Sequence, residues 1–206
     1  MSAATERERT PEELHDALTD IWSNPGGIRR LTIVNHSVIG KRFLVTAFFF
    51  FLVGGALAML IRAQLATSGN AFLSHEAYNQ VFTMHGTVMM FLFTIPAIEG
   101  FSLYLLPKLL GARDLAFPRL SAFGYFCYLF GGTMLLVAMV LGVAPHSGWF
   151  MYTPLSSKPF SPGINNDFWL LGITFVEISA VAIGVELGTT ILKVRAAGMA
   201  LHRMPL

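Results

Sequence analysis

The chain has 206 residues, of which 54% are hydrophobic and 13% are charged, and 18 are phenylalanine. Soluble domains usually carry about 25% charged residues, so this composition argues against a soluble protein and indicates a chain embedded in a lipid bilayer. The formal net charge of +2 gives no reason to expect a nucleic-acid partner. The single cysteine, Cys127, excludes an internal disulfide and a paired-cysteine metal site.

Residues 1–40 precede the first long apolar run, and we expect them to form a cytoplasmic N-terminal segment. Its sequence predicts one short helix, because Thr10 is typical of an N-cap, Pro11 of the first helical position, and Glu13 completes a capping box. We interpret this helix as a solvated surface element in preference to a functional one.

Residues 41–206 contain four apolar runs that are long enough to cross a bilayer, which takes about 20 residues. Backbone groups cannot stay unpaired in hydrocarbon, so each run is expected to be a helix. The fold class is therefore an all-α, polytopic membrane helix bundle, with small residues such as Gly54 and Gly131 allowing close packing. The expected spans are about 43–61, 81–106, 120–143 and 168–192.

The distribution of lysine and arginine predicts the orientation of the spans. Basic residues gather before the first span, between the second and third, and after the fourth, whereas the other two loops hold only Arg62 and Lys158. Since cytoplasmic loops carry the excess of basic residues, we expect both termini to be cytoplasmic and residues 144–167 to form an outer loop.

Ionisable residues inside the spans cost roughly 2.5–3.5 kcal/mol each and usually face a protein interior or a water cavity. His85 and Glu99 lie 14 residues apart in the second run. In an α-helix this separation is about 21 Å along the axis and within about 40° of the same face. Arg62, at the outer end of the first span, is expected at the level of His85, and a cation beside a potential metal ligand suits a cofactor such as haem.

Each of these residues also has a simpler interpretation. A lone histidine in a membrane more often hydrogen-bonds a neighbouring helix than binds a metal, and Arg62 alone is typical of an interfacial, snorkelling residue. Asp114 lies between Arg113 and Arg119, which favours an interfacial ion pair. Glu177 and Glu186 are nine residues apart and point to opposite faces of a helix, so they do not form a paired acid site.

Four stretches of the sequence resemble subunit I of the haem–copper terminal oxidases, most closely the A-type cytochrome c oxidases. They are "LIRAQLA" (60–66), "YNQVFTMHGTVMMFLF" (78–93), "LLPKLLGARDLAFPRLSAF" (105–123) and "SGWFMYTPLS" (147–156). The resemblance implies that His85 is an axial ligand of the low-spin haem and that Arg62 interacts with the ring substituent of this haem, expected to be haem A. It implies further that Asp114 is the cytoplasmic mouth of a proton pathway and that Trp149 lies near a propionate of the high-spin haem.

The chain also departs from the family pattern. Typical members have glycine at the position of Glu99, and asparagines line the proton path at positions matching Leu103, Ser121 and Glu186, none of which is asparagine here. Glu99 and Glu186 are therefore candidates to replace that polar lining, although Glu99 is equally well explained as a hydrogen-bonding partner of a neighbouring helix. The four spans are the first of about twelve that the resemblance implies, and the remaining haem and copper ligands belong to later helices.

We therefore predict the N-terminal portion of a cytochrome c oxidase subunit I in a bacterial plasma membrane. The complete enzyme would pass electrons from cytochrome c, through the copper-bearing subunit II, to oxygen, coupled to proton pumping. Haem A is the cofactor expected here, with the high-spin haem and copper only in the complete subunit. The alternatives are a quinol oxidase subunit of the same superfamily, or a membrane bundle without cofactor and without activity of its own.

Overall fold

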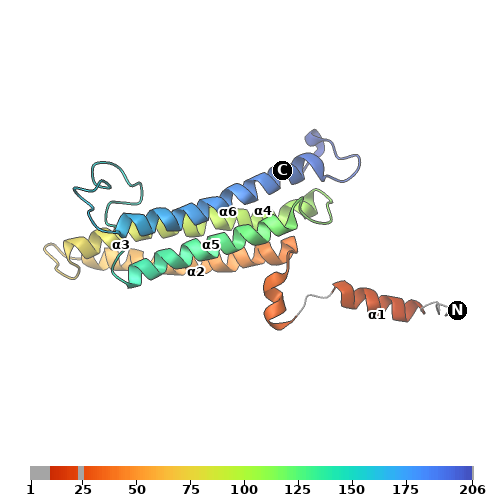
Figure 1. Ribbon diagram of the computed structural model, residues 1–206, viewed down its shortest axis with the longest axis horizontal. Helices are drawn as coiled ribbons and strands as arrows, with labels where there is room; N and C mark the ends of the chain where they lie inside the picture. Colours follow the sequence, from red (N-terminus) through yellow and green to blue (C-terminus); the bar gives the residue numbers. More distant parts are fainter. Residues whose placement is uncertain (1–9, 23–25, 206) are drawn as a thin grey trace, which may run out of the picture. The chain divides into compact units, whose positions relative to one another are not determined.

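The computed structural model describes residues 10–22 and 26–205. The chain divides into two compact units between Ile33 and Val34 (Figure 1). The first unit holds helix α1 (Pro11–Trp22) and a 3-10 turn, η1 (Gly27–Thr32). The predicted capping box is confirmed, because the Thr10 amide donates to Glu13 Oε2 at 2.9 Å and the Glu13 amide donates to Thr10 Oγ1 at 3.2 Å.

The second unit is a bundle of four long helices that lie side by side (Figure 1). The first is α2 (His36–Gln64), and the second is one continuous helix formed by α3 (His75–Thr87), a π-helical segment η2 (Val88–Thr94) and α4 (Ile95–Leu109). The third and fourth are α5 (Pro118–Val140) and α6 (Asn165–Lys193), and a 3-10 turn, η3 (Leu201–Arg203), follows. All four are long and apolar enough to cross a membrane, and no strand occurs within residues 10–22 or 26–205. The predicted all-α bundle is thus confirmed.

Two of the helices begin several residues before the apolar runs from which they were predicted. Asn35 caps α2 by accepting a hydrogen bond from the Ser37 amide at 2.9 Å, and Ser74 caps α3 by accepting from the Ala77 amide at 3.1 Å. Side-chain caps satisfy the unpaired amides of a first helical turn, so polar residues extend each helix beyond its apolar part. As a result, His36 lies in the first turn of α2.

The π-helical segment η2 precedes a proline in the second span. Pro96 has no N–H, so the carbonyl of Leu92, four residues earlier, loses its α-helical donor. Tyr128 of α5 replaces that donor, because its hydroxyl donates to the Leu92 oxygen at 2.6 Å. Thr94 Oγ1 donates to the Met89 oxygen, five residues back, at 2.8 Å. The second span is therefore continuous but more widely wound in its middle than an α-helix.

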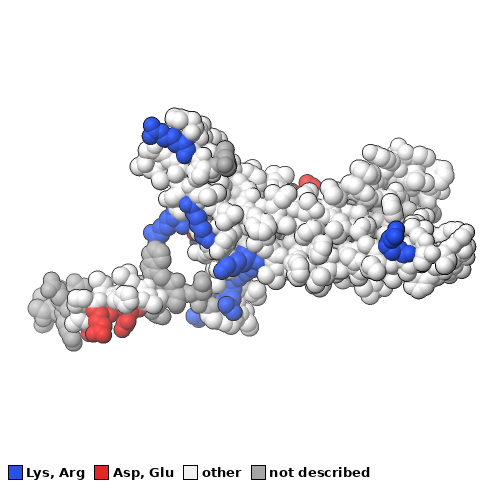
Figure 2. Space-filling model, turned by 180° about the vertical axis from the view of Figure 1, so that it is seen from behind, with Lys and Arg blue, Asp and Glu red and all other residues white. Residues whose placement is uncertain are grey.

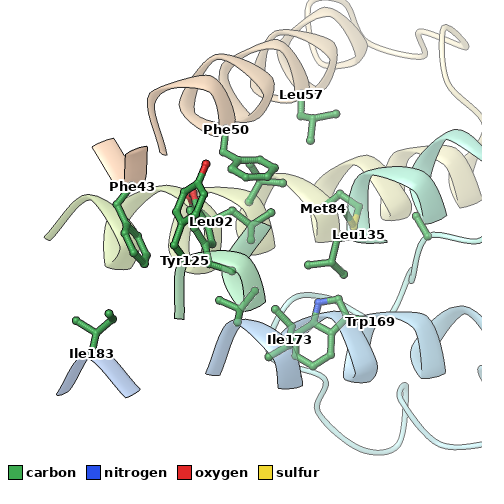
Figure 3. Close-up of a cluster of buried hydrophobic side chains, with 14 of the residues drawn as sticks. Phe43, Phe50, Leu57, Met84, Leu92, Tyr125, Leu135, Trp169, Ile173 and Ile183 are labelled. Carbon is green, nitrogen blue, oxygen red and sulfur yellow. The ribbon is translucent and has the colours of Figure 1, made fainter. Parts of the chain in front are cut away.

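The core lies along the middle of the bundle, where side chains such as Phe50, Leu92 and Leu135 meet (Figure 3). Phe43 of α2 stacks on Tyr128 of α5 with ring centroids 5.4 Å apart. Glycines permit close approach at some positions, since a Cβ at Gly131 would lie 2.5 Å from the Gly172 oxygen. The expectation of close packing is confirmed for Gly54 and Gly131, and Gly132 is packed closely as well. At Gly55, Gly184 and Gly188 an added Cβ would meet no atom of the described chain within 4 Å.

The charged side chains of the bundle gather at one end, which we name the basic end, and leave the middle almost free of charge (Figure 2). The basic end comprises the start of α2, the end of α4, the start of α5 and the end of α6. The opposite end carries Arg62 and Lys158. The basic residues of the basic end are Lys41, Arg42, Lys108, Arg113, Arg119, Lys193 and Arg195.

Candidate functional site

His85 of α3 points towards α2, where its Nδ1 lies 3.0 Å from the carbonyl oxygen of Gly54. A carbonyl oxygen can only accept a hydrogen bond, so Nδ1 carries the hydrogen and the lone pair is on Nε2. Gly54 also lets α2 lie close to the second span, since a Cβ there would lie 2.5 Å from Met89 Sδ. Within the described part of the chain Nε2 has no hydrogen-bond partner.

Trp149 lies next to His85 because its indole packs on Gly86. A Cβ on Gly86 would lie only 2.3 Å from Trp149 Cδ1, so any larger residue would displace the ring. The loop that carries Trp149 is fastened to the same helix, since the Gly148 amide donates to Thr83 Oγ1 at 2.9 Å. Two residues that the sequence singled out separately are thus brought together by the glycine that follows the histidine.

Arg62 is exposed in the last turn of α2 and does not lie at the level of His85. His85 meets α2 at Gly54, eight residues before Arg62, and eight residues correspond to about 12 Å of helix. The expectation of a common level is wrong because α3 begins at His75, six residues before the apolar run starts, which places His85 deeper in the bundle. A long arginine side chain would have to extend towards the middle of the bundle to reach the same cofactor.

The donor set around His85 fits an axial position of a haem. Iron takes a neutral imidazole through one ring nitrogen while the other donates a hydrogen bond that fixes the ring. His85 meets both conditions through Nε2 and through the Nδ1 contact to Gly54. The site is not a metal centre built by side chains alone, because the described residues contain no group of three or more His, Cys, Asp or Glu that could hold a metal.

Asp114, in the α4–α5 loop at the basic end, pairs with a residue that the sequence analysis did not select. His36 Nδ1 lies 3.0 Å from Asp114 Oδ1, and His36 Nε2 lies 3.0 Å from Ser37 Oγ. The Leu115 amide also donates to Asp114 Oδ1 at 2.8 Å. The Asn35 cap was the signal for this pair, since it starts α2 early enough to bring His36 to the loop.

Glu99 of α4 is half-buried and lies apart from both of these groups. Its carboxyl interacts electrostatically with Glu177 of α6 and with Tyr128 of α5, whereas His85 on the same span faces α2. The predicted common face of His85 and Glu99 is therefore wrong. The estimate assumed an α-helix throughout, and η2 between the two residues turns the chain by less per residue.

The fold and the site define a multi-pass, α-helical membrane protein that offers one imidazole nitrogen from inside its bundle. The sequence profile of the family described as cytochrome c and quinol oxidase polypeptide I matches residues 38–206. The chain belongs to that family.

Curated relatives support this assignment. The chain is 45% identical over 201 residues to a putative cytochrome c oxidase subunit 1-beta of Streptomyces coelicolor, covering 97% of this chain and 34% of the relative. It is 46% identical over 176 residues to cytochrome c oxidase subunit 1 of Corynebacterium efficiens, covering 85% of this chain and 30% of that protein. The chain thus spans about a third of the length of these relatives and corresponds to their N-terminal part.

Proposed function

We propose that the chain supplies one axial ligand of the low-spin haem in a cytochrome c oxidase, and that this ligand is His85 Nε2. The observation that carries the proposal is the 3.0 Å contact between His85 Nδ1 and the Gly54 oxygen. It holds the ring in one orientation and leaves the other nitrogen free to bind iron. A haem bound there, expected to be haem A, supplies a one-electron redox centre.

The neighbouring residues shape the cofactor site in this proposal. Trp149 closes the space beside His85 by packing on Gly86, and in the complete enzyme it would lie near a propionate of the high-spin haem. Arg62 would extend from the end of α2 towards the ring substituent of the low-spin haem, where its guanidinium would offer hydrogen-bond donors and a positive charge.

Protons would be taken up at the basic end. Asp114 has a one-third exposed side chain and is held by His36 and the Leu115 amide, which suits a residue at the mouth of a pathway. Glu99 is proposed as a deeper member of the pathway, because a carboxyl inside a membrane span marks a proton relay or an interhelical contact. Its electrostatic interactions with Glu177 and Tyr128, on neighbouring helices, are equally compatible with the second role.

The wider assembly follows from the same proposal. The basic end would face the cytoplasm of a bacterium, with both termini on that side of the plasma membrane. The enzyme would contain further subunits, including the copper-bearing subunit II, and would take electrons from cytochrome c to oxygen while pumping protons. A quinol oxidase is the alternative, and an assay of the purified assembly with reduced cytochrome c and with quinol separates the two.

Replacement of His85 tests the ligand directly. In the assembled oxidase, His85→Ala should abolish the low-spin haem absorption and leave the chain in the membrane, because losing an imidazole does not disfavour insertion. Visible spectroscopy of the purified assembly measures the first result, and immunodetection in membranes measures the second. A wild-type content of low-spin haem in this variant would refute the assignment, because the haem would then take both of its ligands from other parts of the assembly.

A further inference from the structure

Two lysines from different helices share one aromatic ring at the basic end. The Nζ atom of Lys41, in the second turn of α2, lies 5.7 Å from the ring centre of Tyr104. The Nζ atom of Lys108, in the last turn of α4, lies 3.2 Å from the same centre. A cation within about 6 Å of an aromatic ring is attracted to the ring face. The ring of Tyr104 therefore holds two ammonium groups close to each other.

The protein does not neutralise these two positive charges. Both lysine side chains are exposed, and neither forms an ion pair with a carboxylate among residues 10–22 and 26–205. Asp114, the one acidic residue in the sequence of the α4–α5 loop, is held by His36 and the Leu115 amide instead. Because like charges at one place repel each other, an anion that bridges the two ammonium groups would be bound favourably.

The backbones of α2 and α4 are in contact beside this pair of lysines. A Cβ at Gly40 would lie 2.8 Å from the Gly100 oxygen and 2.9 Å from the Tyr104 amide nitrogen. A larger residue at position 40 would therefore push the two helices apart, together with the lysines that they carry.

An exposed apolar ridge runs from each lysine towards the middle of the span. The ridge residues are Val45, Phe48 and Leu52 on α2, and Leu105, Phe101 and Ile98 on α4. Steps of three and four residues from each lysine keep each ridge on one helical face. On both helices this face lies opposite a fully buried residue, Phe43 on α2 and Leu103 on α4. Both ridges therefore face away from the core, on the same side of the helix pair.

We propose that Lys41, Tyr104 and Lys108 bind the headgroup phosphate of an anionic phospholipid, whose acyl chains lie along the two ridges. The phosphate oxygens would accept hydrogen bonds from both ammonium groups, with Tyr104 keeping the lysines together. Basic sites between spanning helices are suited to anionic headgroups. A free phosphate ion would use the lysines alone, whereas a phospholipid matches the lysines and the apolar ridges together.

The simpler explanation is that each lysine extends separately to the membrane surface and meets any phospholipid there. The two explanations differ in headgroup preference. A zwitterionic phospholipid carries a cation of its own beside the phosphate, so it gains less from two further positive charges than an anionic phospholipid does.

The test places the assembled oxidase in phosphatidylcholine nanodiscs that contain a small fraction of photoreactive phosphatidylglycerol, which is anionic. A parallel sample contains photoreactive phosphatidylcholine, and mass spectrometry locates the cross-linked peptides. We expect the anionic probe to label residues 45–52 and 98–105 more strongly than the zwitterionic probe. Lys41→Gln and Lys108→Gln should each weaken this preference by up to about fivefold, and the double variant should abolish it.

Two control variants separate a binding site from a general effect of charge. Lys41→Arg combined with Lys108→Arg keeps both charges and should keep the preference. Lys193→Gln removes an exposed lysine at the end of α6 and should leave the preference unchanged. Equal labelling by the two probes, an equal loss in Lys193→Gln, or a full preference in the double glutamine variant would overturn the proposal. Absence of labelling by either probe would also overturn it, because another protein would then cover this face.

Discussion

At the scale of single residues, the chemistry of each polar side chain depends on which backbone group it meets. His85 is oriented by the main-chain oxygen of Gly54, and Trp149 packs on the neighbouring Gly86, where a Cβ would displace its ring. Asp114 is held by a histidine 78 positions earlier in the chain.

The roles of Asp114 and Glu99 can be separated by removing their charges singly and together. If both belong to one proton route, Asp114→Asn and Glu99→Gln each slow oxygen consumption or proton release by the assembled oxidase. The double variant is then no worse than the poorer single variant, because a route that is already blocked cannot be blocked again. Steady-state oxygen consumption and proton release measure the effect.

The structure makes the outcome for Glu99 decisive. Its carboxyl interacts with Glu177 and Tyr128, whereas the interactions of Asp114 lead to His36 and Glu186. Normal pumping by Glu99→Gln would show that Glu99 has a structural role and that protons move inward from Asp114 by another path.

At the scale of helices, the second span shows how one proline changes the geometry of a whole element. Pro96 leaves the Leu92 carbonyl without its helical donor, the chain winds more widely over Val88–Thr94, and Tyr128 of α5 supplies the missing hydrogen bond. This bond joins two spans in the middle of the bundle, where lipid cannot replace it.

Removal of the Tyr128 hydroxyl should therefore destabilise the bundle. Tyr128→Phe leaves the Leu92 oxygen unpaired, and we expect a loss of about 1 kcal/mol, in the range of interhelical hydrogen bonds in membranes. Thermal unfolding of the purified chain in detergent measures it. Pro96→Ala restores an amide donor, so adding it to Tyr128→Phe should recover part of the loss. If Tyr128→Phe unfolds at the wild-type temperature, the hydrogen bond does not stabilise the bundle.

At the scale of the whole molecule, the four-helix bundle offers one imidazole nitrogen, His85 Nε2, to the haem site that we propose. A low-spin haem needs an imidazole or equivalent group on both faces of the iron. The other histidines of the described bundle lie at its ends: His36 and His202 are at the basic end, and His75 and His146 are at the opposite end. His15 belongs to the separate N-terminal unit.

The purified chain by itself should consequently bind haem only weakly. Titration with haem, followed by absorption spectroscopy, should show no stable six-coordinate, low-spin spectrum unless a partner protein is added. His85→Ala is the matched control, because it shows how much haem the apolar surface takes up without the ligand. A six-coordinate spectrum from the wild-type chain alone would show that a second ligand exists within it.

The sequence by itself determined the class of structure and the residue types of the site. A run of about 20 apolar residues must form a spanning helix, since unpaired backbone groups are too costly in hydrocarbon. His85 stands out because an ionisable group inside such a run is costly, whereas Asp114, in a loop, stands out only through the resemblance of its neighbourhood to the family. The tertiary structure decided which residues meet. Capping residues extend two helices by polar turns beyond the apolar runs. The segment before Pro96 in the second span is π-helical, which changes the direction of the side chains after it. His36 therefore reached Asp114, Glu186 met Ser121, and Glu99 turned away from the face of His85. These outcomes depend on contacts between residues far apart in the chain, which the periodicity of a single helix does not contain.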